Sequence, residues 1–122
     1  MRNTDSVRKA REPEELAQLF IEQANQGNVE GLVALYEPEA VLALPDGRLA
    51  VGSEEIRKFY SALLSARPHF EPGAQRTALR SGGLALTSSQ LTTGAVTAEI
   101  ARRQTDGTWL WVVDQPTIAM GK

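Results

Sequence analysis

The chain has 122 residues, with 13 basic and 15 acidic side chains, and its net charge of −2 lacks the basic excess typical of proteins that bind nucleic acid or anionic membranes. Hydrophobic residues make up 42% and charged residues 23% of the sequence, as in a globular protein that buries one core. The absence of cysteine and the single histidine exclude disulfides, thiolate chemistry and histidine-rich metal sites. These numbers predict one domain with no metal, and with neither nucleic acid nor a membrane as its partner.

The N-terminal segment MRNTDSVRKAR is polar and basic, and no apolar run follows it. It therefore fits neither a signal peptide nor a membrane span. We expect residues 1–11 to form a flexible arm, residues 12–122 to form a single domain, and the protein to be cytoplasmic.

The front half of the chain has the apolar spacing of three helices. Pro13 suits a first helical turn, and Gly27 follows the end of the first apolar stripe. Asn28 suits the N-cap of a second helix, which Pro38 ends, and Ser53 suits the N-cap of a third. The apolar stripes of these helices comprise Leu16, Leu19, Phe20 and Ala24, then Val29, Leu32, Val33 and Tyr36, then Ile56, Phe59, Tyr60, Leu63 and Leu64.

The back half of the chain is divided by turn signals into segments of strand length. A short strand, AVLAL, precedes the third helix, and after His69 the glycine turns at 82–83, 93–94 and 106–107 separate four further strands. Helices followed by strands predict an α+β domain in which the helices pack on one face of a curved, mostly antiparallel sheet.

The strand WLWVVDQP carries one carboxylate, Asp114, among apolar residues. A two-residue turn at Asp106-Gly107, which Asp-Gly favours most, would place Glu99 directly opposite Asp114. Two carboxylates with Cβ atoms about 4.5–5.5 Å apart would repel, so the pair would retain a proton at neutral pH. A neutral acid beside an ionised one suits a hydrogen-bond donor next to a general base. The sequence thus offers Glu99 and Asp114 as candidate catalytic residues.

This register divides the last hairpin into two faces. The face with Glu99 and Asp114 is small and mixed, whereas the other is bulky and apolar and predicts a homodimer interface. A three-residue loop would instead place Glu99 opposite Gln115. Alternatively, Arg103 or a residue of a helix would neutralise one acid, and the pair would be structural or solvated. The predicted dimer face comprises Ile100, Trp109, Trp111 and Val113.

Three stretches, GNVEGLVALYEPEAVLALPDG, GSEEIRKFY and DGTWLWVVDQP, resemble the nuclear transport factor 2-like superfamily, close to the SnoaL-like polyketide cyclases and the ketosteroid isomerase relatives. The resemblance covers about residues 12–118. It implies a cone-shaped roll, also called cystatin-like, in which a bent sheet wraps three helices and leaves an apolar pocket at one end. It also implies that the outer face of the sheet often joins a second copy. These motifs specify the fold, whereas the superfamily carries unrelated functions on it.

The resemblance also implies roles for single residues. In the resembling isomerases a protonated acid donates a hydrogen bond to the substrate oxygen, and Glu99 matches it, while Tyr60 matches a tyrosine of the same network. The general base and the donor tyrosine of those isomerases correspond to Leu44 and Phe20, which argues against steroid isomerisation by that mechanism. The predicted pocket lining comprises Phe20, Tyr36, Leu42, Leu44, Tyr60, Leu86, Ser88, Gln90 and Val112.

Three functions follow from these patterns. The first is binding of a small apolar ketone, steroid-like or polyketide-like molecule, with cofactor-free chemistry at Glu99 and Asp114 of the isomerase, cyclase or lyase type. The second is binding of such a molecule without chemistry, and the third is a dimerisation module that uses the tryptophan face. We expect no cofactor, and as partners a small apolar molecule and a second copy of the chain.

Overall fold

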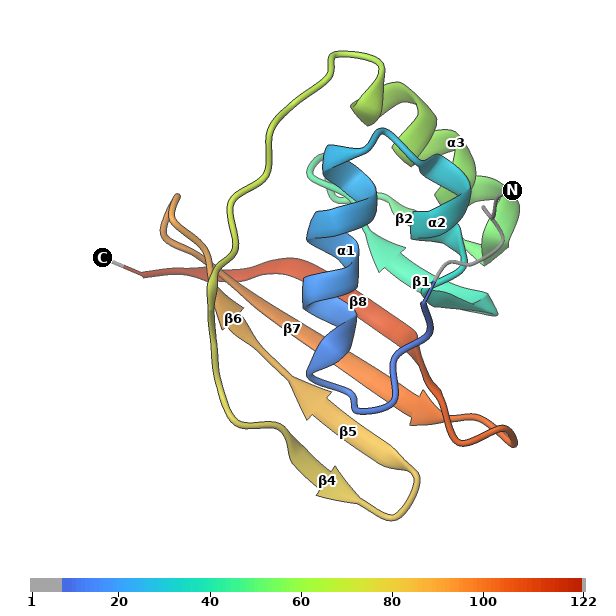
Figure 1. Cartoon of the computed structure of the whole chain (residues 1–122). Helices are drawn as coiled ribbons and strands as arrows, with labels where there is room; N and C mark the ends of the chain where they lie inside the picture. The colour runs from blue at the N-terminus through green and yellow to red at the C-terminus, as the bar shows by residue number, and fades with distance from the viewer. Residues whose placement is uncertain (1–7, 122) are drawn as a thin grey trace.

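A computed structural model describes residues 8–121 of the chain (Figure 1). The helices are α1 (Glu15–Asn25), α2 (Val29–Val33) and α3 (Gly52–Leu64). The strands are β1 (Tyr36–Ala43), β2 (Leu49–Val51), β3 (Ala74–Gln75), β4 (Leu79–Ser81), β5 (Leu84–Thr87), β6 (Ser89–Gln90), β7 (Ala95–Arg103) and β8 (Trp109–Met120).

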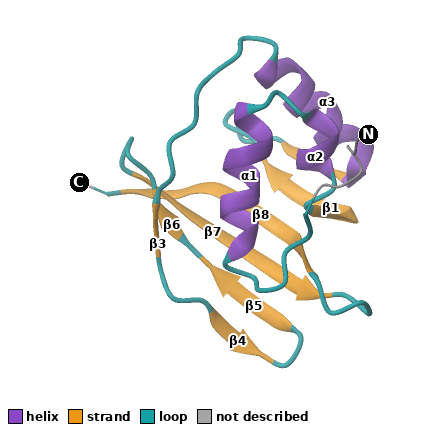
Figure 2. Cartoon of the chain, in the orientation of Figure 1, coloured by secondary structure: helices purple, strands orange, loops and turns teal. Residues whose placement is uncertain are grey.

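The strands form one mixed, mostly antiparallel sheet in the order β2-β1-β8-β7-β5-β4, with β6 beside β7 and β3 beside β6. β1 runs parallel to β8, and the other pairs are antiparallel. The three helices lie on one face, α1 over β8 and α3 over β1 and β2 (Figure 2). The predicted α+β class, with three N-terminal helices on a curved sheet, is confirmed.

Local sequence explains where the helices begin. Asn28 caps α2 as predicted, since its Oδ1 accepts a hydrogen bond of 3.1 Å from the Gly31 backbone N–H. The predicted cap of α3 is wrong, because Val51 is its N-cap residue and the Val51 N–H donates to Glu55 Oε1 at 2.7 Å. Tyr36 opens β1 instead of ending a helix, since α2 stops at Val33.

Three hairpins share a loop of three residues that ends in glycine. In the last of them, the Gln104 carbonyl accepts from the Gly107 N–H at 2.9 Å, and the Gln104 N–H donates to the Thr108 carbonyl at 2.7 Å. This pattern is a type I turn followed by a left-handed residue, a conformation that glycine adopts without strain. The predicted two-residue turn at Asp106-Gly107 is therefore wrong. The glycines that end these three loops, Gly47, Gly94 and Gly107, all have positive φ.

A β-bulge in β8 restores the predicted acid pair. Ala101 pairs with Trp111, but the next pair is Ile100 with Val113, so Val112 is an extra residue on its strand. The bulge cancels the one-residue offset of the loop, and Glu99 lies directly opposite Asp114. The predicted pairing is confirmed, although the turn from which it was inferred has a different form.

Between the loop and the bulge, the pairing differs by one residue from the predicted register, so the residues there point to the opposite face of the sheet from the one predicted. Trp109 and Trp111 lie before the bulge, so they point toward the helices and are only 4% exposed in the core. Their assignment to an outer dimer face is wrong. Ile100 and Val113 lie at the bulge and are exposed on the outer face.

The loop at 92–94 also has three residues instead of the predicted two, so the pairing of β5 with β7 is shifted by one residue from the predicted register. The other set of alternating β5 side chains therefore faces the helices. Leu86 pairs with Ile100 and is exposed on the outer face, so its predicted place in the pocket lining is wrong. The buried residues of β5 and β6 are Ala85, Thr87 and Ser89, and Ser88 is only half-buried.

The predicted N-terminal arm falls partly on described residues. Residues 1–7 lie outside the described part of the chain. Ala10 is buried, and its carbonyl accepts a hydrogen bond of 2.9 Å from the Trp109 N–H, while Lys9 forms an exposed ion pair with Asp106. Ala10 therefore joins this segment to the start of β8, while Arg8 and the Arg11 N–H bond to Glu22 and Glu15 of α1.

Candidate functional site

Two acids lie side by side on the helix-facing side of the sheet. Glu99 on β7 is 8% exposed, and Asp114 on β8 is 6% exposed. Asp114 is also the neighbour of the fully buried Leu42 on β1, so it lies near the middle of the sheet. The strand register thus brings both predicted catalytic carboxylates into the interior.

A chain of hydrogen bonds connects Asp114 to two tyrosines. The Tyr36 hydroxyl donates to Asp114 Oδ2 at 2.6 Å, and the Tyr36 and Tyr60 hydroxyl oxygens are 2.7 Å apart. Because Tyr36 has one proton and donates it to Asp114, Tyr60 is the donor in the second bond. Both tyrosines are buried, as the predicted pocket lining required, and they come from β1 and α3.

Glu99 is held by a threonine that the sequence analysis missed. The Thr87 hydroxyl donates to Glu99 Oε1 at 2.6 Å, and Thr87 is buried opposite Glu99 on β5. The signal was present in the Thr92-Thr93-Gly94 segment, because a three-residue loop there predicts this pairing. A two-residue loop instead predicts Ser88.

No basic side chain among residues 8–121 forms a salt bridge with either acid. Arg103, the predicted neutralising residue, is exposed at the end of β7. The neighbouring Arg102 pairs instead with Glu37 at 2.9 Å. The interior acids are therefore balanced by hydrogen-bond donors and by protonation.

Burial, and after it the neighbouring Glu99 charge, together raise the pKa of Asp114 to about 7, against the opposing hydrogen bond from Tyr36. Burial also raises the pKa of Glu99, while hydrogen bonds from Thr87 and Thr97 lower it. Burial moves the pKa of both tyrosines above the usual range. The pair therefore holds a proton to a higher pH than two isolated carboxyls would, and the more deeply buried Asp114 is the better placed of the two to carry it.

Aromatic rings fill the interior beside this network. The Phe20 ring of α1 lies 5.8 Å from the Tyr60 ring and 6.2 Å from the Trp111 ring, and the Tyr36 ring lies 5.2 Å from Trp111. Phe70, from the segment between α3 and β3, packs edge-on against Phe20 at 5.7 Å. Phe20 and Phe70 thus close the interior on this side.

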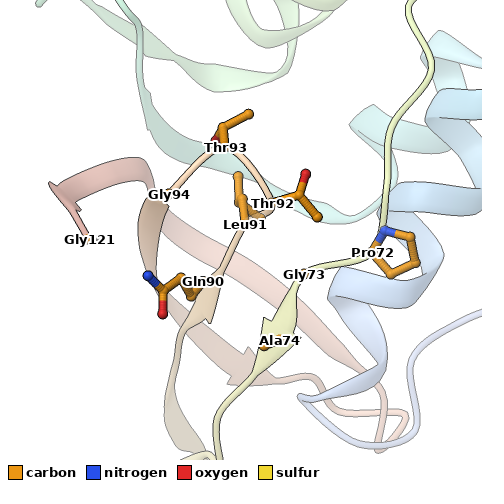
Figure 3. A pocket seen from close by; sticks show the side chains of 9 residues that line it. All are labelled: Pro72, Gly73, Ala74, Gln90, Leu91, Thr92, Thr93, Gly94 and Gly121. Atoms are coloured by element: carbon orange, nitrogen blue, oxygen red, sulfur yellow. The ribbon is translucent and has the colours of Figure 1, made fainter.

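Two hollows in the described part of the chain lie away from the acids. The larger, of about 660 Å³, opens between the segment before β3 and the β6–β7 hairpin (Figure 3). The second, of about 570 Å³, lies at the C-terminal ends of α1 and α3. Of the predicted pocket-lining residues, only Gln90 lines either hollow.

The remaining predicted positions lie in the core or are half-buried. Leu42 is in the core, Leu44 is half-buried against it, and Val112 is the half-buried residue of the bulge. The positions that correspond to the isomerase base and donor tyrosine, Leu44 and Phe20, supply neither a carboxylate nor a hydroxyl. The structure therefore brings together Tyr36, Tyr60, Glu99 and Asp114, and it excludes Leu86 from that group.

The described residues contain no group of three or more histidine, cysteine, aspartate or glutamate side chains placed to hold a metal ion. No helix within 8–121 has both the length and the apolar character needed to cross a membrane.

Solved structures share this fold at low sequence identity. A domain of unknown function with a cystatin-like fold from Nostoc punctiforme has a TM-score of 0.72 and 16% identity, over 86% of this chain and 74% of that one. A ketosteroid isomerase-like protein from Erwinia carotovora atroseptica has a TM-score of 0.65 and 18% identity, over 84% and 89% of the two chains. An NTF-2 like protein of unknown function from Shewanella oneidensis has a TM-score of 0.66 and 14% identity, over 84% and 93%. At these identities the likeness establishes the nuclear transport factor 2-like, or cystatin-like, fold alone.

Sequence comparison identifies the family. No curated protein matches the chain. The family model for the SnoaL-like domain matches residues 17–122. This range contains α1 except for its first two residues, the other two helices and the whole sheet. The chain therefore belongs to the SnoaL-like domain family.

Proposed function

We propose that this protein binds a small apolar molecule with a carbonyl oxygen between its helices and its sheet, with that oxygen at the Glu99 and Asp114 pair. The observation that carries the proposal is a pair of buried, adjacent carboxyls without a cation, one of them bonded to the Tyr36–Tyr60 chain. A buried carboxyl without a cation destabilises a fold, so its presence favours a functional role.

The arrangement suits acid–base chemistry on a ketone. Protonated Asp114 donates a hydrogen bond to the carbonyl oxygen, while ionised Glu99 removes a proton from the carbon beside the carbonyl. The products are an enol or enolate and a protonated Glu99, which returns the proton to the same or another carbon and so completes an exchange or an isomerisation. The greater burial of Asp114 favours this assignment of donor and base, which reverses the one that the family resemblance implies for Glu99.

A ligand reaches the pair by displacing Phe70. Residues 65–73 connect α3 to β3, and the Asn25 side chain is bonded to the backbone of this segment. Asn25 Nδ2 donates to the Phe70 carbonyl at 3.0 Å, and the Phe70 N–H donates to Asn25 Oδ1 at 2.7 Å. Asn25 also lines the second hollow, which gives the segment space to move.

The test of binding uses 1-tetralone and its deoxygenated analogue tetralin in thermal denaturation. A ligand that binds only the folded state at 100 times its Kd stabilises it by about 2.7 kcal/mol, so 1-tetralone should raise the Tm and tetralin should raise it less. The substitutions Glu99→Gln and Asp114→Asn should remove the preference for the ketone, and the exposed Glu39→Gln is the matched control. An equal preference in all four proteins would refute a role for the pair.

The test of chemistry follows deuterium incorporation next to the carbonyl. In D₂O, enolisation by Glu99 replaces the α-hydrogens of 1-tetralone with deuterium, which proton NMR detects as loss of signal. If exchange is no faster with the parent protein than with Glu99→Gln, Glu99 does not catalyse enolisation. The protein would then bind the ketone without chemistry, which is the alternative that the sequence also allows.

We infer a second function, homodimerisation, from a row of apolar side chains across the outer face of the sheet. Strand pairing places these residues side by side, one on each strand of the main path, and five of the six are exposed. A contiguous apolar row of this kind favours a protein partner. The row comprises Val51, Val41, Val113, Ile100, Leu86 and Leu79. The cytoplasmic location expected from the sequence stays a prediction.

A further inference from the structure

The indole nitrogen of Trp111 is a buried donor without an acceptor. Trp111 is 4% exposed, and its Nε1 has no hydrogen-bond partner among the described residues. An unsatisfied buried donor costs about 1–3 kcal/mol, and buried polar groups are rarely left unpaired. The acid–base proposal above makes no use of this donor.

The bulge at Val112 places Trp111 on the same face as Asp114. In a regular strand, residues three apart point to opposite faces, so Trp111 and Asp114 would be separated by the sheet. The extra residue reverses the alternation, and both side chains point toward the helices. Bulges next to functional sites often redirect a side chain in this way.

Tyr36 lies against both side chains, at different ends. The Trp111 ring lies 5.2 Å from the centre of the Tyr36 ring, whereas Asp114 Oδ2 accepts the hydrogen bond from the Tyr36 hydroxyl. Phe20 adjoins Trp111 on another side at 6.2 Å. A ligand therefore has two potential hydrogen-bonding groups, Asp114 near the hydroxyl of Tyr36 and Trp111 Nε1 near its ring. The side chains around them are aromatic rings.

We propose that Trp111 Nε1 donates a hydrogen bond to a second oxygen of the bound molecule. The ligand class is then a flat, mainly apolar skeleton with two oxygen acceptors, one at the acid pair and one at Trp111. An indole N–H donates and never accepts, so the second group is a carbonyl or ether oxygen. This inference rests on the proposed function, because the first oxygen occupies the acid pair.

A matched pair of ketones tests the second contact. 1,4-Naphthoquinone has two carbonyls and no hydrogen that Glu99 could remove to form an enol, and 1-tetralone has the same fused-ring skeleton with one carbonyl. A neutral hydrogen bond contributes about 0.5–1.5 kcal/mol, so the parent protein should bind the dione about fivefold more tightly. The substitution Trp111→Phe should remove this preference. Trp109→Phe is the control, because that buried ring lies under Arg80 and away from the acids.

Indole NMR of the parent protein supplies a readout that needs no variant to fold. Hydrogen bonding of the dione to Trp111 should move the Hε1 resonance of that indole downfield and leave that of Trp109 in place. The competing arrangement is an N–H directed at the Phe20 or Tyr36 ring, which would shift Hε1 upfield in the free protein and keep it there with the dione.

The outcomes separate the two proposals. If both ketones bind and depend on Asp114, but neither the affinity difference nor the Hε1 shift appears, the role of Trp111 is overturned and the proposed function stands. If neither ketone binds, both proposals fall. A dione preference that Trp111→Phe removes and Trp109→Phe retains supports both.

Discussion

The proton on Asp114 has a direct consequence for stability. Well below the unfolded pKa of 3.8 this carboxyl is protonated in both folded and unfolded chains, so it contributes no pH dependence there. As the pH rises toward the folded pKa of about 7, the unfolded chain ionises first and the folded state becomes less stable. A rise in pKa from 3.8 to about 7 corresponds to about 4 kcal/mol as an upper bound, and the raised pKa of Glu99 acts in the same direction.

We therefore expect stability measured by urea unfolding to fall between pH 4.5 and 8. Asp114→Asn cannot ionise, so this variant should lose most of that slope, whereas the exposed Glu39→Gln should retain it. An Asp114→Asn protein with the slope of the parent would show that another group causes the pH dependence.

Tyr36 sets the balance between the two forms of Asp114. Its hydroxyl bonds to the ionised carboxylate and opposes the rise in pKa. A hydrogen bond to a charged group contributes about 1.5–3 kcal/mol, so Tyr36→Phe should raise the pKa of Asp114 by about one unit or more. Carbon-detected NMR titration of the Asp114 carboxyl measures this directly. Tyr60→Phe should have a smaller effect, because Tyr60 contacts Asp114 only through Tyr36; an equal effect would contradict that order.

At the level of secondary-structure elements, apolar periodicity was enough to predict the three helices, but glycine signals left the hairpins ambiguous. Asp-Gly suits both a two-residue turn and the end of a three-residue loop, and the second form occurs at Asp106-Gly107. The bulge at Val112 has no signal in a run of apolar residues. Glu99 and Asp114 were paired correctly because these two offsets cancel, while Trp109 and Trp111, which precede the bulge, were placed on the wrong face.

The segment between α3 and β3 is held by the side chain of Asn25, so its mobility can be tested with one substitution. Asn25→Ala removes two hydrogen bonds to the Phe70 backbone, so the Phe70 amide should exchange with solvent faster, by about tenfold for each 1.4 kcal/mol lost. Hydrogen exchange detected by NMR measures it. Gln26→Ala, one residue on and also exposed, is the control. Unchanged exchange at Phe70 would mean that packing against Phe20 alone holds the segment.

For the whole molecule, the sheet has two unlike faces. All three helices of the described part cover the inner face, which holds the acids and the aromatic rings (Figure 2). The outer face has the apolar row on β2, β1, β8, β7, β5 and β4. The sequence predicted that this face joins a second copy through Ile100, Val113 and the two tryptophans, of which only Ile100 and Val113 lie on the outer face. The row contains neither tryptophan, because both precede the bulge and point toward the helices.

The row predicts a dimer that depends on Val113 and Ile100, which lie at its centre. Val113→Asp would bury an uncompensated charge between two copies, which costs several kcal/mol. The dissociation constant of the dimer should therefore rise by about 100-fold or more, which corresponds to about 3 kcal/mol. Sedimentation velocity at micromolar concentration should show a dimer for the parent and a monomer for Val113→Asp. Ser61→Asp adds the same charge on the exposed side of α3 and should remain dimeric. If the parent sediments as a monomer, or Val113→Asp as a dimer, the outer face is not the interface and the exposed row needs a different partner.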